Sequence, residues 1–431
     1  MTAEARGQYP LGGSVTLAGL EGDPHPLLAV LREREPVSWL PALGGWLVTR
    51  RDLALRVLRD ATRFTVDDAR FSTARVVGPS MLSLDGAEHD RHRGPFSHGF
   101  SRGEVHARLE AYVDAEAERL VTGMRPAGAA DLRTGLAGPL SVAVVAQALG
   151  LGQTDPSVVL SWYGAIVDAV SELARRGDAG VSSAGSAAFG MLSSSLRAAI
   201  AAHGRSTLLG EAAAGESAAG EAAAGESAAG GGGAGEAAAG GRALETGEVV
   251  SNAAVLMFGG IETTEGMITN VVLHLLSHPD QLGLVRGDPG LVPGAVEESL
   301  RLEPAAAVVD RYATCDIQIG GAAIRRGDLV TVSLAGAGRD PTVFPDPDRF
   351  DVRRGNARLH LAFARGPHFC LGAHLASLEA QAAVRALLRS LPGLRLDPER
   401  PSAPRGLVFR KPPSLHVLWD PGIQHAGGEQ F

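Results

Sequence analysis

The sequence predicts a mainly α-helical protein that also contains small β-sheets (an α+β fold), and two patterns support this prediction. Apolar residues recur at helical spacing over long stretches, of which residues 246–277 form the longest. Short alternating apolar runs, which are typical of strands, occur near the N-terminus and again at 308–332, where glycine-containing turns separate them. With 431 residues, the chain is long enough to bury a large core.

The N-terminal elements follow in order from these two periods. We expect a helix at 27–33, because a Pro-containing start precedes an apolar-periodic run. A β-hairpin is expected at 37–49, where two alternating runs flank a turn with proline and glycine. A short helix at 51–59 follows. Residues 64–84 show no clear period and carry several charges, so we expect a loop there.

The later elements are mostly helical. A proline closes an expected helix at 293–303, and residues 407–410 read as a late strand. Apart from the long segment named above, four amphipathic helices are expected in the first half of the chain, at 104–122, 132–150, 155–174 and 181–203.

Residues 211–241 differ in kind from the rest of the chain. The sequence Glu-Ala-Ala-Ala-Gly-Glu-Ser-Ala-Ala-Gly occupies 211–220 and recurs at 221–230, without any large apolar residue to bury. Each glycine lowers helix stability by about 1 kcal/mol. We therefore expect a disordered surface insertion, with a partner-binding element as the alternative. Residues 1–22 are expected to form a flexible N-terminal segment, and 421–431 a C-terminal tail.

Composition excludes several classes of function. The net charge of −8 argues against a general nucleic-acid-binding surface. No apolar run reaches the roughly 20 residues of a membrane span, and the first residues lack the apolar core of a signal peptide. The two cysteines, Cys315 and Cys370, are too few for a disulfide framework or a cysteine-rich zinc site. We expect a cytoplasmic protein without a membrane or nucleic-acid partner.

One of these cysteines stands in an unusual setting. Cys370 lies between Gly366 and Gly372 and directly before a stripe at helical spacing, formed by Leu371, Leu375, Leu378 and Ala382. A thiolate persists near neutral pH beside a metal, a cation or a helix N-terminus. The stripe predicts the helix N-terminus, and His368 is a candidate cation. Taken alone, a single cysteine is more often a buried small hydrophobe.

Two further groups of residues each have a structural and a functional interpretation. His89 and Arg93 are spaced i, i+4 and share a helix face, where two donors can grip a carboxylate. The alternatives are a solvated basic face or a weak zinc set of His89, His92 and His98. In the longest helix, paired glycines at 259–260 are costly and call for a packing or a ligand-binding reason. The hydroxyl of Thr263 can turn toward the carbonyl of residue 259.

The stretch from Phe363 to Gly372 resembles the haem-binding loop of the cytochrome P450 superfamily, Phe-Gly-x-Gly-x-His/Arg-x-Cys-x-Gly. It departs at one position, where Ala364 replaces a glycine. Residues 259–263 are similar to the family pattern Ala/Gly-Gly-x-Asp/Glu-Thr. Further features occur in the family's order, namely His89-x-x-x-Arg93, Glu298-x-x-Arg301 and Pro347-x-Arg349-Phe350. The resemblance extends from about residue 23 to 419 and is to bacterial-type members that lack a membrane anchor.

The resemblance implies the P450 fold, a single large helical domain (residues 23–420) around buried haem b, with the sulfur of Cys370 as axial ligand of the iron. The family's contacts with the haem propionates fall on His89, Arg93, Arg311 and His360. The complete set of implied cofactor-binding residues is His89, Arg93, Gly259, Gly260, Arg311, His360, Phe363, Gly366, His368, Cys370 and Gly372.

The resemblance also implies an activity. A thiolate ligand favours O–O cleavage, and Glu262 and Thr263 match the family's acid and alcohol that relay protons. The expected reaction inserts one atom of O₂ into a mostly apolar organic substrate, by hydroxylation or epoxidation, in the tailoring of a bacterial secondary metabolite. Oxidative coupling, a peroxygenase activity and a non-catalytic haem protein that binds ligands are the alternatives.

The resemblance has two further implications, a structural clasp and an electron donor. Glu298, Arg301 and Arg349 match a buried clasp that holds the fold around the haem loop. Since no flavin or iron–sulfur segment is present, the implied electron source is a ferredoxin with its reductase. Its docking site is expected on the cysteine side of the molecule, over Arg91, Arg102, Arg358 and Arg365.

Overall fold

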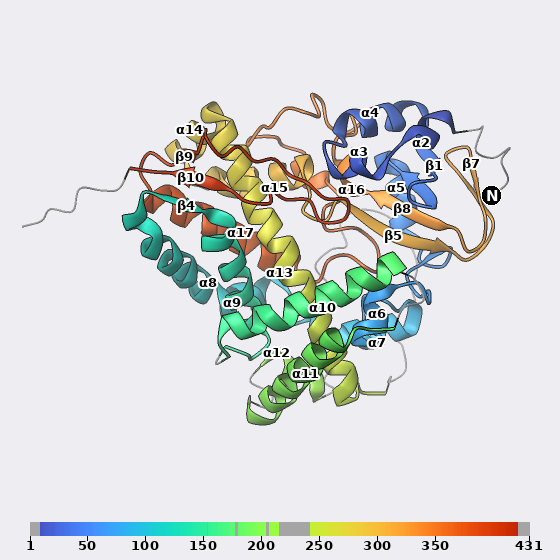
Figure 1. Ribbon diagram of the computed structural model, residues 1–431, viewed down its shortest axis with the longest axis horizontal. Coiled ribbons are helices and arrows are strands. Elements are labelled where there is room, and N and C mark those ends of the chain that lie inside the picture. The colour runs from blue at the N-terminus through green and yellow to red at the C-terminus, as the bar shows by residue number, and fades with distance from the viewer. Residues whose placement is uncertain (1–8, 153, 177–179, 204–206, 215–241, 421–431) are drawn as a thin grey trace, which may run out of the picture.

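The computed structural model describes residues 9–152, 154–176, 180–203, 207–214 and 242–420. Helices dominate the molecule, and the β-sheet that contains β1, β2, β5 and β8 lies to one side with α2–α5 (Figure 1). The prediction of a mainly helical protein with small sheets is confirmed. The helices are α2 Pro10–Ser14, α3 Leu17–Glu21, α4 His25–Arg34, α5 Arg51–Arg59, α6 Ser72–Val77, α7 Gly86–Ser97, α8 Arg102–Met124, α9 Gly138–Ala148, α10 Pro156–Arg176, α11 Ser183–His203, α12 Leu208–Ala213, α13 Thr246–Ser277, α14 Pro279–Gly287, α15 Val292–Leu302, α16 Leu334–Gly338 and α17 Ala373–Ser390.

Helix α13 runs through the middle of the molecule, and α10 crosses in front of it (Figure 1). It begins with a reciprocal capping box between Glu245 and Glu248 and ends just before Pro279. Its buried residues lie on all sides, as expected for a helix inside a large core. Because α9, α15 and α17 pack around it, the central part of α13 is held rigidly beside the segment that carries Cys370.

The strands form three small sheets. The largest has the order β1-β2-β8-β5-β3, in which β2 and β8 are parallel and the other pairs antiparallel. The predicted hairpin at 37–49 is confirmed, with Val37 opposite Val48. The strands are β1 Val37–Leu40, β2 Gly45–Val48, β3 Phe64–Thr65, β4 Ala129–Asp131, β5 Val308–Ala313, β6 Ile317–Ile319, β7 Ala322–Ile324, β8 Leu329–Ser333, β9 Arg395–Leu396 and β10 His416–Leu418.

Three local predictions are corrected by the structure. Residues 10–21 are not loose, because α2 and α3 form there and Leu20 is buried in a core cluster. The stretch 64–84 is not only a loop, since it contains β3 and the short helix α6, whose Val77 is buried. The late strand at 407–410 is absent, and this stretch makes only isolated bridges, such as Ala306 with Phe409.

The expected insertion and tail fall largely outside the described residues. Of residues 211–241, only 211–214 are described, and 211–213 belong to α12. The predicted tail at 421–431 is not described either. Within the described part of the chain, no helix is both long and apolar enough to cross a membrane.

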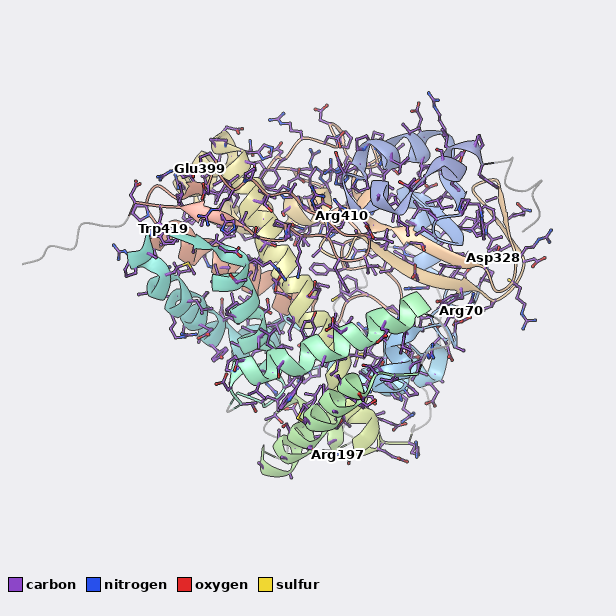
Figure 2. All side chains as sticks on the ribbon, viewed as in Figure 1. Arg70, Arg197, Asp328, Glu399, Arg410 and Trp419 are labelled. Carbon is purple, nitrogen blue, oxygen red and sulfur yellow. The ribbon has the colours of Figure 1, made fainter. Side chains whose placement is uncertain are left out.

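A buried arginine, Arg410, which Figure 2 labels near the middle of the view, fixes the C-terminal segment against the rest of the fold. The guanidinium of Arg410 pairs with Glu303 at 2.9 Å and donates to the carbonyl oxygens of Leu20 and Gly22. Removing one partner of such a buried pair is costly, because a charge stays behind without compensation. This anchor holds residues 405–411 beside α13.

Candidate active site

A cavity of about 270 Å³ lies where α7, α13, α17 and the Cys370 segment meet. It is lined by the predicted Cys370, Arg93 and His368 together with Gly259 and Thr263. The rest of its wall is largely apolar and includes Val255, Leu256, Met267, Leu300, Ala305 and Val309. Residues from distant parts of the sequence that were predicted to act together are therefore brought to one cavity.

Local hydrogen bonds shape the segment around Cys370. The Cys370 N–H donates to the carbonyl of Phe363 at 2.9 Å, which closes the segment into a loop. Helix α17 begins at Ala373 with Gly372 as its N-cap, so the prediction that Cys370 stands at a helix N-terminus is confirmed. The Gly372 N–H also donates to the Cys370 sulfur.

Two small residues of this loop, Ala364 and Gly366, allow its backbone conformation. Ala364, the departure from the family pattern, has φ = +57°, a left-handed conformation that costs a non-glycine residue about 1 kcal/mol. Gly366 has φ = +79°, and a Cβ there would lie 2.4 Å from the carbonyl oxygen of Leu58. The close contact with α5 therefore requires a glycine at 366.

The Cys370 sulfur faces the cavity. Burial within the surrounding protein raises the pKa of its thiol, while the Gly372 N–H and the charge of Arg93 lower it. A bound metal ion deprotonates a coordinating thiol outright. The pairing of an accessible sulfur with an N–H donor and a buried cation is suited to a metal-bound thiolate.

Two histidines lie close together at the polar end of the cavity, where His368 is part of the wall and His89 packs against His368. His89 and His368 have ring centroids 4.5 Å apart, and His368 Nε2 lies 2.7 Å from Asp85. His89 Nε2 is buried without a hydrogen-bond partner among the described residues. Burial, with the positive charge of His368 next, lowers the pKa of His89. A carboxylate entering here would supply the missing partner.

The neighbouring Arg93 supports the same interpretation. It donates to the carbonyl of Phe369 at 2.8 Å, beside the sulfur loop, and its side chain is part of the cavity wall. A thiol at one point, and the Nε2 of His89 with the guanidinium of Arg93 at another, match the iron and the propionates of a haem. The residues present thus fit the cofactor that the sequence implies.

Two further predicted propionate contacts, His360 and Arg311, are not part of the cavity wall. His360 accepts from the Ala362 N–H at Nδ1 and lies 3.2 Å from Glu297 at Nε2, so both of its nitrogens have partners within the protein. The imidazole instead braces α15 against Phe363, whose ring is 5.8 Å away. Arg311 is buried and donates to the carbonyl of Asp310, and it lies within the field of Asp85, the partner of His368.

The paired glycines of α13 have different roles. A Cβ at Gly259 would meet no atom within 4 Å, so this position opens the cavity. A Cβ at Gly260 would lie 3.1 Å from Val145 of α9, which makes Gly260 mainly a helix-packing residue. The Thr263 hydroxyl donates to the carbonyl of Gly259 at 2.5 Å, as predicted from the sequence.

The zinc alternative is not supported, because no metal-binding group of three His, Cys, Asp or Glu occurs in the described ranges.

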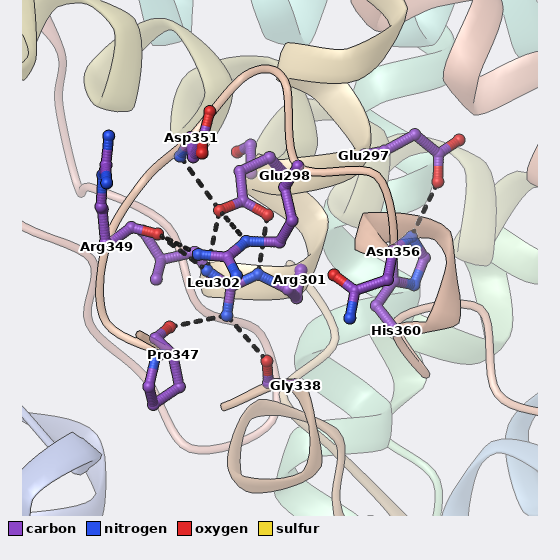
Figure 3. A network of polar contacts seen from close by, with 12 residues as sticks. Glu297, Glu298, Arg301, Leu302, Gly338, Pro347, Arg349, Asp351, Asn356 and His360 are labelled. Carbon is purple, nitrogen blue, oxygen red and sulfur yellow. Dashed lines mark hydrogen bonds and ion pairs between the residues drawn. The ribbon is translucent and has the colours of Figure 1, made fainter. Parts of the chain in front are cut away.

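The Glu298 clasp is present, but its third member differs from the prediction (Figure 3). Arg301 pairs with Glu298 at 2.7 Å and donates to the carbonyls of Gly338 and Pro347. The second arginine on Glu298 is Arg354, at 2.9 Å. Arg349 contributes its backbone carbonyl, and its side chain is exposed and points away from Glu298. The arginine assignment from the Pro-x-Arg-Phe motif is therefore wrong.

Three residues of this region were missed from the sequence, namely Tyr163, Lys411 and Glu379. The first two contact Glu262, and neither belongs to a local motif. The third is Glu379, which lines the cavity from α17 and is buried, with one carboxylate oxygen lacking any partner in the described structure. Burial raises the pKa of Glu379 well above its usual value. The sequence signal that could have identified Glu379 is an acidic residue within the apolar stripe of α17.

The raised pKa of Glu379 predicts a pH-dependent difference in stability. Above about pH 4.5 the unfolded chain releases this proton and the native protein retains it, so wild-type stability falls as pH rises toward the folded pKa. Glu379→Gln removes this effect, and the variant should gain about 1.4 kcal/mol per pH unit over wild type in that window. Urea unfolding between about pH 5 and about pH 8 measures it. The exposed control Glu399→Gln should differ from wild type in unfolding free energy by an amount that does not change with pH. The same constant difference for Glu379→Gln would refute a protonated Glu379.

The comparisons with known proteins agree with this geometry. The sequence profile described as Cytochrome P450 matches residues 290–417. Cytochrome P450 monooxygenase PikC from Streptomyces venezuelae is 34% identical over 408 residues, which cover 92% of this chain and 89% of PikC. Nocardicin C N-oxygenase from Nocardia uniformis subsp. tsuyamanensis is 33% identical, with 97% of this chain and 100% of the relative covered. The crystal structure of CalO2 has a TM-score of 0.80 at 30% identity and covers 94% of this chain and 98% of its own.

The relatives bear on the alternatives that the sequence left open. Their names include monooxygenase, oxygenase and hydroxylase, which favours insertion of oxygen over oxidative coupling or ligand binding without turnover. The cavity supplies the sulfur and the polar end that a haem requires. This chain belongs to the cytochrome P450 family and is a haem-thiolate monooxygenase.

Proposed function

We propose that Glu262 and Thr263 are the proton-delivering pair of this monooxygenase, and that its cofactor is haem b held by Cys370, His89, Arg93 and His368. Haem bound at Cys370 supplies the activation of O₂. The observation that carries the proposal is the position of Thr263 on the wall of the cavity that Cys370 also lines, with Glu262 adjoining it on α13. The Thr263 hydroxyl, which now donates to Gly259, can turn into the cavity and donate there.

Removing the Thr263 hydroxyl should separate the consumption of reductant from product formation. In Thr263→Ala, we expect reductant consumption within about twofold of wild type, while product falls by about tenfold or more and hydrogen peroxide accumulates, because protons no longer reach the reacting oxygen in order. The measurement is the ratio of product to reductant consumed.

A matched control exists on the same helix. The Thr269 hydroxyl also donates to the carbonyl four residues earlier, Glu265, at 2.9 Å, but Thr269 does not line the cavity. Thr269→Ala should therefore keep wild-type coupling. Unchanged coupling in Thr263→Ala, or equal losses in both variants, would remove Thr263 from this role.

We further propose a mostly apolar secondary metabolite as substrate. The cavity wall is mainly apolar, and the small residues Ala305 and Ala306 together with Val309 leave room opposite the Cys370 loop. PikC of Streptomyces venezuelae and nocardicin C N-oxygenase of Nocardia uniformis are, by their names, a monooxygenase and an N-oxygenase. A screen of secondary metabolites for shifts of the Soret band tests the class. Binding confined to small polar compounds would contradict it.

A ferredoxin with its reductase is the proposed electron donor. The docking surface is narrower than the sequence indicated, because the Arg91 guanidinium bridges Glu88 and Glu248 and contributes no unpaired charge. Arg358 is 78% exposed, and Arg102 is also exposed. Exposed Leu359 lies beside Arg358 and adds an apolar contact of the kind found at interface centres.

A further inference from the structure

A tight turn between α6 and α7 forms part of the cavity wall. Its central residues, Met81 and Leu82, both line the cavity. The Ser83 N–H donates to the Ser80 carbonyl at 3.0 Å, and the Ser80 N–H donates to the Ser83 hydroxyl at 3.1 Å. These bonds close the turn but use neither N–H of its central residues. Met81 is only 5% exposed, so its N–H requires a partner from elsewhere in the fold.

Asn252 of α13 supplies that partner. Its Oδ1 accepts from the Met81 N–H at 2.8 Å, and its Nδ2 donates to the Glu248 carbonyl, one turn earlier in α13, at 2.8 Å. Because an N–H can only donate and a carbonyl can only accept, these two contacts fix which way the amide faces. The side chain of Asn252 is fully buried. An asparagine inside a helix thus holds a turn that lies 171 positions away in the sequence.

A histidine from α7 contacts the same amide. His92 Nδ1 lies 2.9 Å from Asn252 Nδ2 and is the acceptor of that bond, since the amide oxygen already faces Met81. Burial lowers the pKa of His92, which favours a neutral ring with its proton on Nε2. That nitrogen lies beside Glu248 and Arg91. The turn, α7 and α13 therefore meet at one buried side chain.

Packing brings the turn and α13 together where the helix becomes part of the cavity wall. A Cβ at Gly78, just before the turn, would lie 3.0 Å from the Ser251 hydroxyl of α13. Val255 and Leu256, which follow on the same helix, line the cavity themselves. The position of the turn relative to α13 therefore sets the width of the cavity at this point.

We infer that Asn252 is a positioning residue for substrate selection, because it ties the turn to α13 and so fixes Met81 and Leu82 in the cavity wall. The inference rests on the proposed binding of an apolar substrate in this cavity, and it adds a determinant of which substrates fit. Without the amide, the Met81 N–H loses its buried acceptor, and the turn can move outward until water satisfies that group. A wall that has moved no longer excludes long apolar groups, so selectivity falls.

Methionine labelling observes the turn directly in the haem-loaded protein. The sequence has six methionines, and the variant Met81→Leu assigns the signals of Met81. In ferrous, carbon-monoxide-bound protein labelled with ¹⁵N and ε-¹³C methionine, we expect the wild-type Met81 N–H to be protected from solvent exchange, as are those of Met257 and Met267 in α13. In Asn252→Ala, the exchange of the Met81 N–H should accelerate by about a hundredfold or more, while Met257 and Met267 stay protected. A wild-type Met81 N–H that exchanges like an unstructured peptide would overturn the inference without any variant.

The second readout is selectivity among probe ligands. N-butylimidazole and N-dodecylimidazole bind haem iron through nitrogen and place tails of different length in the cavity, and titration of the Soret shift gives both Kd values. In Asn252→Ala, we expect the ratio of the two Kd values to move by about tenfold in favour of the dodecyl probe, because the longer tail reaches more of the released wall.

The control for this titration lies in the same turn. The buried Ser80 hydroxyl has no hydrogen-bond partner among the described residues, so Ser80→Ala should keep the wild-type ratio. An unchanged ratio in Asn252→Ala, or equal changes in both variants, would overturn the inference. The proposed substrate class is tested separately by the metabolite screen, so its failure is distinguishable from a failure of Asn252 to set the ratio.

Discussion

Cys370→Ser protein, reduced and treated with carbon monoxide, will lack the red-shifted Soret band that marks thiolate ligation in the wild type. A serine hydroxyl does not ionise near neutral pH, whereas the Cys370 thiol is already supported by the Gly372 N–H and the charge of Arg93. The polar end of the cavity, with His89 and Arg93, is unchanged by this substitution. Haem should therefore still bind, and the variant should lose the band and monooxygenase turnover together.

The second cysteine provides the control for this experiment. Cys315 is exposed, lies outside the cavity lining and is not part of any motif. Cys315→Ser should keep both the red-shifted band and activity. A Cys370→Ser spectrum identical to wild type would show that another side chain holds the iron, and the assignment of the cavity would then be wrong.

The Glu298 clasp predicts the largest effect on stability. Glu298 and Arg301 have fully buried side chains, and Glu298 receives Arg301, Arg354 and the Asp351 N–H. Glu298→Gln leaves two guanidinium groups beside a neutral amide, and we expect a loss of about 3–5 kcal/mol in the free energy of unfolding. Urea unfolding monitored by circular dichroism measures this loss. A change below about 0.5 kcal/mol, the range of ordinary surface substitutions, would contradict it.

The same network allows a comparison of two arginines five residues apart. Arg354→Ala removes an ion pair of 2.9 Å with Glu298 and bonds to the carbonyls of Pro345 and Asp346, so it should destabilise by several kcal/mol. Arg349→Ala keeps the carbonyl that Arg301 and Arg354 use and should change stability by less than about 0.5 kcal/mol. Equal losses would restore the assignment made from the sequence motif.

Predictions from the sequence succeeded where the relevant contacts are local. The helix after Cys370 and the bond from Thr263 to Gly259 lie within one turn or one element, and both are present. The hairpin at 37–49 is likewise formed between neighbours in sequence. Short helices were less visible, because α6 has only six residues and too few apolar positions to show a period.

Roles assigned by motif position failed where two residues compete for one partner. Arg349 occupies the expected motif, but the chain turns there and brings Arg354 to Glu298. Sequence spacing places a residue near a site, whereas the direction of its side chain depends on the packing around it.

The local periodicity of the sequence was sufficient to predict the helical character, because it depends on groups within a few residues of one another. The loop around Cys370 and the class of chemistry were predicted from the resemblance of several separated motifs to the cytochrome P450 superfamily. The partners of the acidic side chains depended on the assembled fold. Tyr163 and Glu262 are 99 positions apart, and Arg354 and Glu298 are 56 apart. Such pairs form because a buried charge requires an opposite charge or a hydrogen-bond partner nearby. The packing of distant elements supplies that partner, and no local sequence pattern predicts which residue it is.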